Sequence, residues 1–544
     1  MRRAVAAAAL VLLIVVGVQA QRTERAVESW RPLHYDVEMS FDDQLSTILT
    51  ARTQIKGVIL KDKTAKVDLD FGPMEIDSVS VDNRQAMFQW SPDERLIVEL
   101  AKATRAGDTF TIAIAYHGHP KDGLILAKDR DGNASATGDN WPNRVHYWIP
   151  SLDHPSAKAT VSFTITAPQR YEVIANGRFV TLTGNAVTSH WKFDEAKPIP
   201  PYCMIVTLNQ GAVINSPFQA VPLIYNVPQK DREYAPKGFS SAAASIGLFS
   251  QTIAPYPYEK LALIVAATRF GGMENSSAIV FNNNLLDPRP NEKMSARFGI
   301  PTRVESVVAH EIAHQWFGDS VTESTWADLW LSEGFATYFA GMFVQKKESE
   351  DAFRDYMKTA AQRYFNFEKQ RNIPIHDTQT TNLMDLLNPN NYEKGAWVLH
   401  MLRERLGDEA FFNGLRNYYS AHKEANATTE DLRAALEKSS GKDLKEFFTR
   451  WVYGTGHPRY ELGWGSMERA SVTSLFVRLN QLQAGDAFLD PVPIEFTVGG
   501  KKVRRTIAPT GKSTEVTIQL PANPSAVTID PDDTLLKEVV SIKP

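Results

Sequence analysis

Residues 310–333 begin with the pentapeptide His-Glu-Ile-Ala-His and end, after eighteen further residues, on Glu333 within Trp-Leu-Ser-Glu-Gly. On a helix, His310 and His314 are four residues apart and project from one face, so both imidazoles can reach one tetrahedral Zn²⁺. Glu333 can supply the third ligand and leave the fourth position to water. Glu311 lies beside the first ligand and can accept a proton from that water. The stretch therefore predicts one zinc ion per chain together with its own base.

A motif of five residues also occurs by chance, and the alternative is a surface helix with two spare histidines. The surroundings favour the metal site. Val308 and Trp316 belong to an apolar segment typical of a buried helix, where polar side chains need partners. A second predicted helix places Glu333 in one stripe with Trp326 and Trp330. A bare carboxylate there would be costly, and a bound cation would neutralise it.

The composition is that of a globular protein. Of 544 residues, 43% are hydrophobic and 22% are charged, and the net charge is −4. This length suffices for three domains of ordinary size. The basic clusters Lys501-Lys502 and Arg504-Arg505 are short, whereas a nucleic-acid-binding domain carries a basic face. We therefore expect no nucleic-acid partner.

The N-terminus has the pattern of a secretory signal peptide over residues 1–20. Arg2 and Arg3 precede the apolar run Ala4–Val18, and Ala20 offers a small residue at the cleavage site. The alternative is an uncleaved membrane anchor, although the run is short for one. No later stretch could span a bilayer, so we expect export to the periplasm or beyond the cell, with no membrane span after cleavage. The single cysteine, Cys203, excludes an internal disulfide.

Hydrophobic periodicity divides the remaining chain into three domains and predicts a multidomain α+β fold. Residues 21–215 alternate as short strands of an antiparallel sheet domain. Residues 216–455 are mainly helical and contain the predicted zinc site. Residues 456–544 return to strand patterns and fit a small β-sandwich. The clearest strands predicted in the first domain are Tyr35–Phe41, Ala65–Phe71, Arg95–Leu100, Phe110–Tyr116, Thr160–Ala167, Tyr171–Asn176 and Ala186–Phe193.

Two further segments contain groups that could contribute chemistry. Gly271-Gly272-Met273-Glu274 follows an apolar strand, and paired glycines allow a backbone to approach a ligand closely. A simple hairpin turn is the alternative for this segment. Tyr392 begins a predicted helix, and its hydroxyl could donate to a developing oxyanion. On its own it could equally be an ordinary half-buried tyrosine.

These motifs occur together, and in this order, in one family. The chain resembles the M1 zinc aminopeptidases, the gluzincin group that includes aminopeptidase N and leukotriene A4 hydrolase. The resemblance covers nearly the whole chain after the predicted signal peptide and rests on Gly-x-Met-Glu-Asn, His-Glu-x-x-His-x18-Glu and the later Tyr-Glu-Lys-Gly. It implies an N-terminal β saddle domain, a thermolysin-like catalytic domain and a further C-terminal part.

The resemblance also implies roles for individual residues. His310, His314 and Glu333 match the zinc ligands, and Glu311 matches the general base. Tyr392 matches a tyrosine that stabilises the oxyanion. In the other motif, Glu274 matches the carboxylate that holds the α-amine of the substrate, and Gly271, Gly272 and Met273 match the backbone beside the substrate.

The chain departs from the family pattern in two places. The family places a second amine anchor, Glu or Gln, in the first domain, where this chain has Asp139 followed by Asn140. Many members also end in a large helical domain over the active site, whereas about ninety residues of strand character follow residue 455 here. The active site is then more open, or another subunit covers it.

Together these observations predict an exported zinc aminopeptidase that hydrolyses the N-terminal bond of peptides with a free N-terminus. The alternatives within enzymes are a thermolysin-type endopeptidase and an epoxide hydrolase activity like that of one family member. The alternative outside enzymes is a catalytically inactive scaffold. The sequence leaves open the preferred first residue and the oligomeric state.

Overall fold

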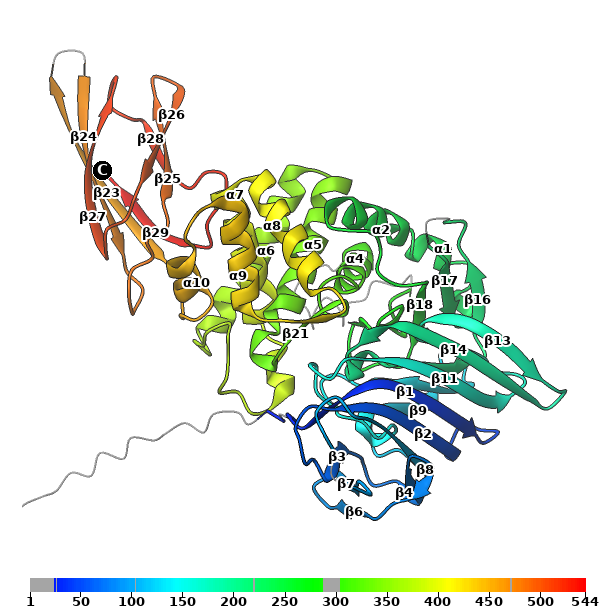
Figure 1. Ribbon diagram of the computed structural model, residues 1–544. Coiled ribbons are helices and arrows are strands. Elements are labelled where there is room, and N and C mark those ends of the chain that lie inside the picture. The colour runs from blue at the N-terminus through cyan, green and yellow to red at the C-terminus, as the bar shows by residue number, and fades with distance from the viewer. Residues whose placement is uncertain (1–23, 26, 103, 219–220, 287–303, 470–471) are drawn as a thin grey trace, which may run out of the picture.

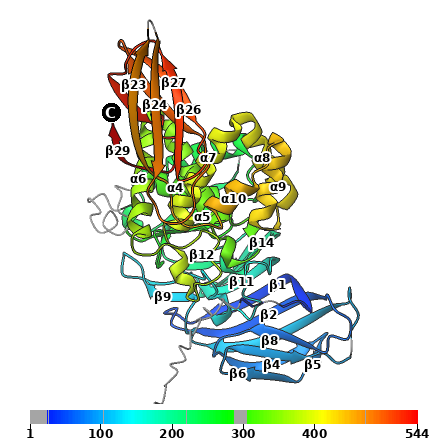
Figure 2. The ribbon, with the colours of Figure 1, turned by 90° about the vertical axis from the view of Figure 1, so that its left-hand side faces the viewer.

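The computed structural model describes residues 24–25, 27–102, 104–218, 221–286, 304–469 and 472–544. The predicted signal peptide at residues 1–20 lies outside them. Figure 1 shows an N-terminal β region and a C-terminal β region at opposite ends of a helical middle region, and the view in Figure 2 keeps this arrangement. Among the described residues, no helix is both long enough and apolar enough to cross a bilayer. The order of regions agrees with the predicted α+β class.

The described strands of the N-terminal region form one large sheet and two small ones. In spatial order the large sheet contains β13 (Arg178–Gly184), β14 (Thr188–Ile199), β11 (Ala159–Pro168), β1 (Trp30–Phe41), β2 (Ile48–Ile59), β8 (Thr109–Gly118), β4 (Glu75–Val81) and β5 (Arg84–Gln85). One small sheet contains β3 (Lys66–Asp70), β7 (Arg95–Glu99) and β6 (Phe88–Ser91). The other contains β12 (Glu172–Ala175), β15 (Val206–Asn209), β10 (Ala134–Gly138) and β9 (Leu124–Lys128). Short 3₁₀ turns, η1 (Val145–Tyr147) and η2 (Pro201–Cys203), lie in the loops.

The large sheet is not purely antiparallel, which corrects one detail of the predicted fold. β1 pairs with β2 in antiparallel fashion but with β11 in parallel, with Tyr35 opposite Val161. Alternation of apolar residues specifies which face of a strand is buried. It does not specify the direction of a neighbour that arrives more than a hundred residues later.

The middle region contains one mixed sheet covered by helices. Its strands are β16 (Ala212–Asn215), β17 (Leu223–Val227), β18 (Leu261–Ala266), β20 (Ala278–Asn282) and β19 (Gly272–Met273), in that spatial order. The described α-helices are α1 (Ala235–Gly238), α2 (Ser241–Thr252), α4 (Val304–His314), α5 (Trp330–Lys347), α6 (Glu350–Glu368), α7 (Gly395–Leu406), α8 (Asp408–His422), α9 (Thr429–Ser440) and α10 (Lys445–Trp451). Shorter elements are η3 (Gln229–Asp231), β21 (Val321–Glu323), η4 (Trp326–Asp328), η5 (Leu383–Leu386), the π-helical turn η6 (Asn390–Lys394) and β22 (Ala425–Ala427).

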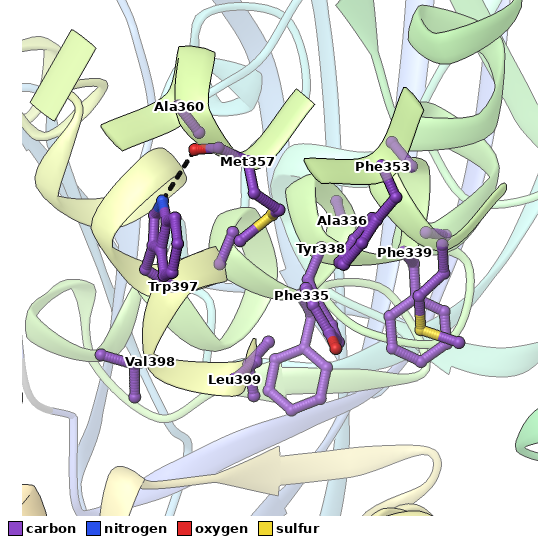
Figure 3. Close-up of a cluster of buried hydrophobic side chains, with 14 of the residues drawn as sticks. Phe335, Ala336, Tyr338, Phe339, Phe353, Met357, Ala360, Trp397, Val398 and Leu399 are labelled. Atoms are coloured by element: carbon purple, nitrogen blue, oxygen red, sulfur yellow. Dashed lines mark hydrogen bonds between the residues drawn. The ribbon is translucent and has the colours of Figure 1, made fainter. Parts of the chain in front are cut away.

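Helices α5, α6 and α7 enclose an apolar core directly behind the predicted metal site. Figure 3 shows side chains of all three helices meeting there, including Phe335, Met357 and Trp397. The Trp397 indole donates to the Met357 carbonyl at 2.9 Å, which satisfies its buried N–H. Full burial of a side chain such as that of Phe335 or Met357 stabilises the folded protein by about 1.5–3 kcal/mol. This core fixes α5, which carries Glu333, against the helices that surround it.

The C-terminal region is a pair of β-sheets with a shared apolar core. One sheet contains β27 (Ser513–Leu520), β24 (Val472–Gln481), β23 (Arg459–Arg469) and β29 (Glu538–Lys543), and the other contains β26 (Lys501–Ile507), β25 (Val492–Val498) and β28 (Ala526–Ile529). Leu475 and Leu479 of the first sheet and Phe496 of the second are buried in one cluster. This arrangement agrees with the predicted two-sheet structure. The exact domain limits stay predictions.

A buried lysine joins the N-terminal and middle regions. The ammonium of Lys158 donates to the carbonyls of Asp319 and Ser320 at 2.7 and 2.8 Å and to the Thr322 hydroxyl at 3.0 Å. Buried charges persist when such hydrogen bonds compensate them. The contact lies a few residues beyond the end of α4, so it ties the first β region to the segment that follows the histidines.

Candidate active site

Helices α4 and α5 bring the three predicted metal ligands together. The Nε2 atoms of His310 and His314 are 3.1 Å apart. Glu333 Oε2 lies 3.3 Å from the first nitrogen and 3.4 Å from the second. The predicted second helix was expected to carry Trp326, Trp330 and Glu333 in one stripe. The helix is shorter than that: α5 starts at Trp330, and Trp326 lies in the separate turn η4.

These distances fit a zinc ion. Tetrahedral bonds of about 2.0–2.1 Å place neighbouring ligand atoms about 3.3 Å apart, which is the spacing of the three atoms found here. Glu333 Oε2 is buried and has no hydrogen-bond partner in the described part of the chain. Burial alone raises the pKa of Glu333, yet His314 and His310 lower it to about 2. The Glu333 carboxylate therefore keeps its negative charge beside two imidazoles, and this set of groups suits a metal cation.

Hydrogen bonding prepares His314 for metal binding. Its Nδ1 lies 3.2 Å from the Phe317 carbonyl and 3.0 Å from the Ser332 hydroxyl. A carbonyl only accepts, so Nδ1 carries a proton, and Nε2 faces His310 and Glu333. Burial alone would lower the pKa of His314, but the carboxylates of Glu274 and Glu333 raise it to about 10, so a metal bound at Nε2 would displace a proton. The histidine is 1% exposed, so packing also fixes the orientation of the ring.

Glu311 is held against the backbone of Gly272. A Cβ built on Gly272 would lie 2.3 Å from Oε1 and from Cδ of Glu311, so only glycine permits this approach. Burial raises the pKa of Glu311 well above its ordinary value, although His314 opposes the change. A carboxyl group with a raised pKa is a stronger base, as proton transfer at neutral pH requires.

Glu274 lies close to both Glu311 and His314. One carboxylate oxygen of each glutamate and one ring nitrogen of His314 all lie within 4.8 Å of one another. The side-chain NH₂ of Gln315 donates to the backbone carbonyl of Glu274 at 2.9 Å. The side-chain oxygen of Gln315 accepts from the backbone N–H of Ser277 at 2.8 Å. Burial raises the pKa of Glu274 to about 7. A cationic group bound there would favour the charged carboxylate.

Tyr392 approaches the site from the π-helical turn η6. Its hydroxyl donates to Glu333 Oε1 at 2.7 Å, and its ring is parallel to that of His310 at a centroid distance of 6.0 Å. Burial raises the pKa of Tyr392 well above its ordinary value. The hydroxyl therefore keeps its proton and can donate to an oxyanion beside the metal. π-Helical turns of this kind often occur at functional sites.

These groups line one cavity of about 730 Å³. Its wall includes the backbone of Gly271 and Gly272 and the side chains of Met273 and Arg363. Besides the predicted residues, the described wall contains Trp141, Phe270, Ser306, Val307, Thr337, Val344, Glu348, Ala352, Asp355, Tyr356, Thr359, Ala360, Met384, Leu387, Asn388, Pro389 and Glu393. The volume is ordinary for a small-ligand site and suits a short peptide segment.

The structure places Asp139 differently from the other predicted site residues. Asp139 is not among the described residues that line the cavity. It is fully buried, forms an ion pair of 3.2 Å with Arg144 and accepts from the Arg269 N–H at 3.2 Å. Burial raises its pKa to about 6. In this region Trp141, two residues further along the chain, forms the wall instead.

Gln315 and Ser332 also contribute to the site, although the sequence motifs do not include them. Gln315 joins α4 to the Glu274 segment, and Ser332 contacts the ring of His314. One signal was available for Gln315, because it follows Glu311 by four residues on the same helix face and precedes the apolar Trp316. No spacing or motif in the sequence points to Ser332 in the same way.

Comparison with known protein families gives two adjacent matches. Residues 31–203 match the peptidase M1 N-terminal domain, and residues 239–451 match the peptidase family M1 domain. The second match contains α4, α5 and Tyr392.

Individual relatives agree with these matches. Probable aminopeptidase 1 of Sulfurisphaera tokodaii is 27% identical over 450 residues, which cover 81% of this chain and 56% of that protein. Glutamyl aminopeptidase of Homo sapiens is 29% identical over 330 residues, which cover 59% of this chain and 34% of that protein. The crystal structure of an M1 zinc metallopeptidase from Deinococcus radiodurans shares the fold, with a TM-score of 0.67 and 23% identity over 79% of this chain and 95% of that one. The chain spans little more than half the length of the two Sulfurisphaera tokodaii aminopeptidases that it matches.

Proposed function

The chain belongs to peptidase family M1, and we propose that it is a zinc aminopeptidase that removes the first residue of peptides with a free N-terminus. One observation carries this proposal. A single cavity holds a His-His-Glu triad with zinc-like spacing, a buried glutamate against the triad and a second buried glutamate within 4.8 Å of the first. The roles of the individual residues below are part of the proposal.

Glu311 acts as the general base. Zinc, when bound by His310, His314 and Glu333, polarises the scissile carbonyl and lowers the pKa of the attacking water. Glu311 accepts the proton of that water and later delivers it to the leaving amine, a role that its position beside His310 permits. The missing side chain at Gly272 leaves the room that this carboxylate occupies.

Glu274 limits hydrolysis to the first peptide bond. Standard bond lengths place the amine nitrogen and carbonyl carbon of one residue about 2.5 Å apart. An ammonium bound to Glu274, which lies within 4.8 Å of Glu311 and His314, therefore brings the first carbonyl to the metal triad.

Tyr392 stabilises the negative charge that develops on the carbonyl oxygen. Its hydroxyl keeps its proton, lies beside the triad and is held by Glu333 before substrate binds. A fixed donor of this type needs little reorganisation during the reaction.

The decisive experiment is hydrolysis of aminoacyl-coumarin substrates by the purified protein, with and without a chelator. We expect activity that the chelator abolishes and stoichiometric zinc restores. N-acetylated versions of the same substrates should be cleaved at least about a hundredfold more slowly, because they cannot form the ion pair with Glu274. Equal cleavage of blocked peptides would indicate an endopeptidase, and no cleavage in the presence of zinc would indicate an inactive scaffold.

We also propose that the protein is exported, on the basis of the signal-like segment at residues 1–20. Cell fractionation after expression of the full chain, followed by N-terminal sequencing, tests this. A mature chain that begins after Ala20 in the exported fraction is the expected result. A chain that retains Met1 in the membrane fraction would instead indicate an anchor.

A further inference from the structure

Five apolar residues of the cavity wall come from three segments of the chain, one of which leads directly into Glu274. They are Trp141, Phe270, Met273, Met384 and Leu387. Trp141 and Met273 are both 2% exposed and belong to one buried cluster, against which Phe270 and Leu387 pack. We refer to these five residues as the Trp141 pocket.

Trp141 is a rigid part of this wall. Its ring meets Phe270 edge-to-face at a centroid distance of 6.1 Å and Trp326 at 5.5 Å. Contacts on two sides leave the indole little freedom to move aside when a ligand enters. The ring of Trp141 therefore forms a fixed aromatic part of the pocket wall.

The described cations at the Trp141 pocket and in the cavity wall already have anionic partners. The guanidinium of Arg144 lies 5.9 Å from the centroid of the Phe270 ring and forms an ion pair with Asp139 at 3.2 Å. Among the described residues that line the cavity, Arg363 is the one lysine or arginine. It comes from α6, and its guanidinium lies 2.7 Å from the carboxylate of Glu393, beside Tyr392. A ligand carboxylate in the pocket would lose its hydration without gaining a partner. A ligand ammonium there would compete with the substrate amine for Glu274.

We propose that the Trp141 pocket receives the side chain of the first residue and selects large apolar residues, such as leucine, methionine and phenylalanine. This inference rests on the proposed function. The amine and the side chain of the first residue share one Cα, so an amine bound to Glu274 directs that side chain to the walls next to Glu274. Met273 precedes Glu274 directly, and the other four residues line the same cavity.

The expected selectivity follows from apolar burial. Each buried methylene group is worth about a factor of four in binding. Leucine has three more side-chain carbons than alanine, so kcat/KM should be up to about 60-fold higher for leucine. Acidic and basic first residues should fall at least about a hundredfold below leucine, because the pocket would desolvate their charge.

The test is a panel of Leu, Met, Phe, Ala, Glu and Lys coumarin amides with the zinc-loaded protein. Trp141→Ala should reduce the leucine-to-alanine ratio of kcat/KM at least about tenfold. Phe179→Ala is the matched control, because Phe179 is exposed on β13 and should leave all ratios unchanged. Calorimetry with free leucine and free glutamate, two candidate products, gives a second readout and should detect the leucine alone.

Met384→Arg provides a test that does not depend on the folding of the Trp141 variant. Met384 is 39% exposed, so the fold should tolerate the change. The new cation should raise kcat/KM for the glutamate substrate at least about tenfold and lower it for leucine. The inference is overturned if the wild type prefers Glu or Lys, or if both variants change all substrates equally. Inactivity on every substrate would overturn the proposed function as well, which separates the two failures.

Discussion

At the scale of single residues, the carboxylate of Glu311 lies against the backbone of Gly272, and we expect it to act as the base. Glu311→Gln keeps the shape of the side chain but cannot accept the proton. Removal of a general base costs about 10²–10⁴-fold in rate, so kcat should fall by that factor. Metal analysis should still find one zinc per chain, because His310, His314 and Glu333 are unchanged.

A matched control for this substitution is Glu409→Gln, because Glu409 is exposed near the start of α8. It should keep full activity. If Glu311→Gln retained more than about a tenth of wild-type kcat, Glu311 would not be the base.

Tyr392→Phe removes the hydroxyl that donates to Glu333 at 2.7 Å. Loss of one oxyanion donor typically lowers kcat by about 10²–10³-fold. KM should change little, because the donor acts mainly on the transition state. Steady-state kinetics separate the two parameters, and Tyr234→Phe, at a position 49% exposed, is the control. A rise in KM at constant kcat would instead mean that Tyr392 binds the ground state.

The close approach of His310 and His314 was predictable from the sequence because their spacing matches the helix period, whereas the buried position of Asp139 was not. His310 and His314 share a helix face through the period of the helix itself. The position of Asp139 depends on Arg144 and on the Arg269 N–H, which reaches it from a distant segment. Pattern reasoning has no access to such tertiary pairs, so it also missed the place of Trp141 in the cavity wall.

At the scale of elements, the strand β2 shows why some structure escapes prediction. β2 pairs with both β1 and β8, yet it is absent from the predicted strands. Its buried face includes Ala51 and Thr53, whose hydroxyl bonds the Tyr116 hydroxyl at 3.0 Å. Small and polar residues weaken the apolar alternation that marks a strand. β8, by contrast, alternates clearly, and its central part was predicted.

The crossing of α5 and α7 offers a test of how elements position the site. A Cβ on Gly395 would lie 3.0 Å from the Gly334 Cα. Gly334 follows Glu333 directly, and Gly395 is the first residue of α7, directly after the turn η6 that carries Tyr392. Gly395→Ala should therefore force the helices apart, lower stability by about 1–3 kcal/mol and reduce kcat. Thermal unfolding and steady-state kinetics measure the two effects.

The control for the crossing is Gly247→Ala in α2, where an added Cβ meets nothing within 4 Å. Alanine is a better helix former, so stability should rise by up to about 1 kcal/mol. If Gly395→Ala behaved like this control, the close approach of the two helices would not matter to the site.

At the scale of the whole molecule, the order of the three regions was predictable but their docking was not. The spacing of apolar residues changes from the strand pattern to the helix pattern and back along the chain, so it marks the three regions. Their junctions depend on buried polar contacts such as that of Lys158 with the carbonyls of Asp319 and Ser320. In the sequence Lys158 looks like an exposed lysine, because its acceptors are backbone atoms far along the chain.

A buried histidine at the junction with the C-terminal region leads to a prediction about pH. His400 of α7 is 6% exposed, and its Nε2 donates to the Asp533 carbonyl at 3.3 Å. Burial lowers the pKa of His400 to about 4, whereas an unfolded histidine has a pKa of about 6.5. Between these values the unfolded chain takes up a proton that the folded chain does not. Stability therefore falls as the pH drops from 6.5 towards 4, by about 2 kcal/mol at pH 5.

His400→Gln removes this titration and keeps a side-chain N–H for Asp533. The difference in melting temperature between pH 7 and pH 5 should therefore be smaller in the variant than in the wild type, by about 4–8 °C. His190→Gln, at an exposed position on β14, should leave the difference unchanged. An equal loss of stability in wild type and His400→Gln would show that other groups cause the acid sensitivity. A smaller loss in the variant would mean that His400 couples the pH to the contact between α7 and the Asp533 loop of the C-terminal region.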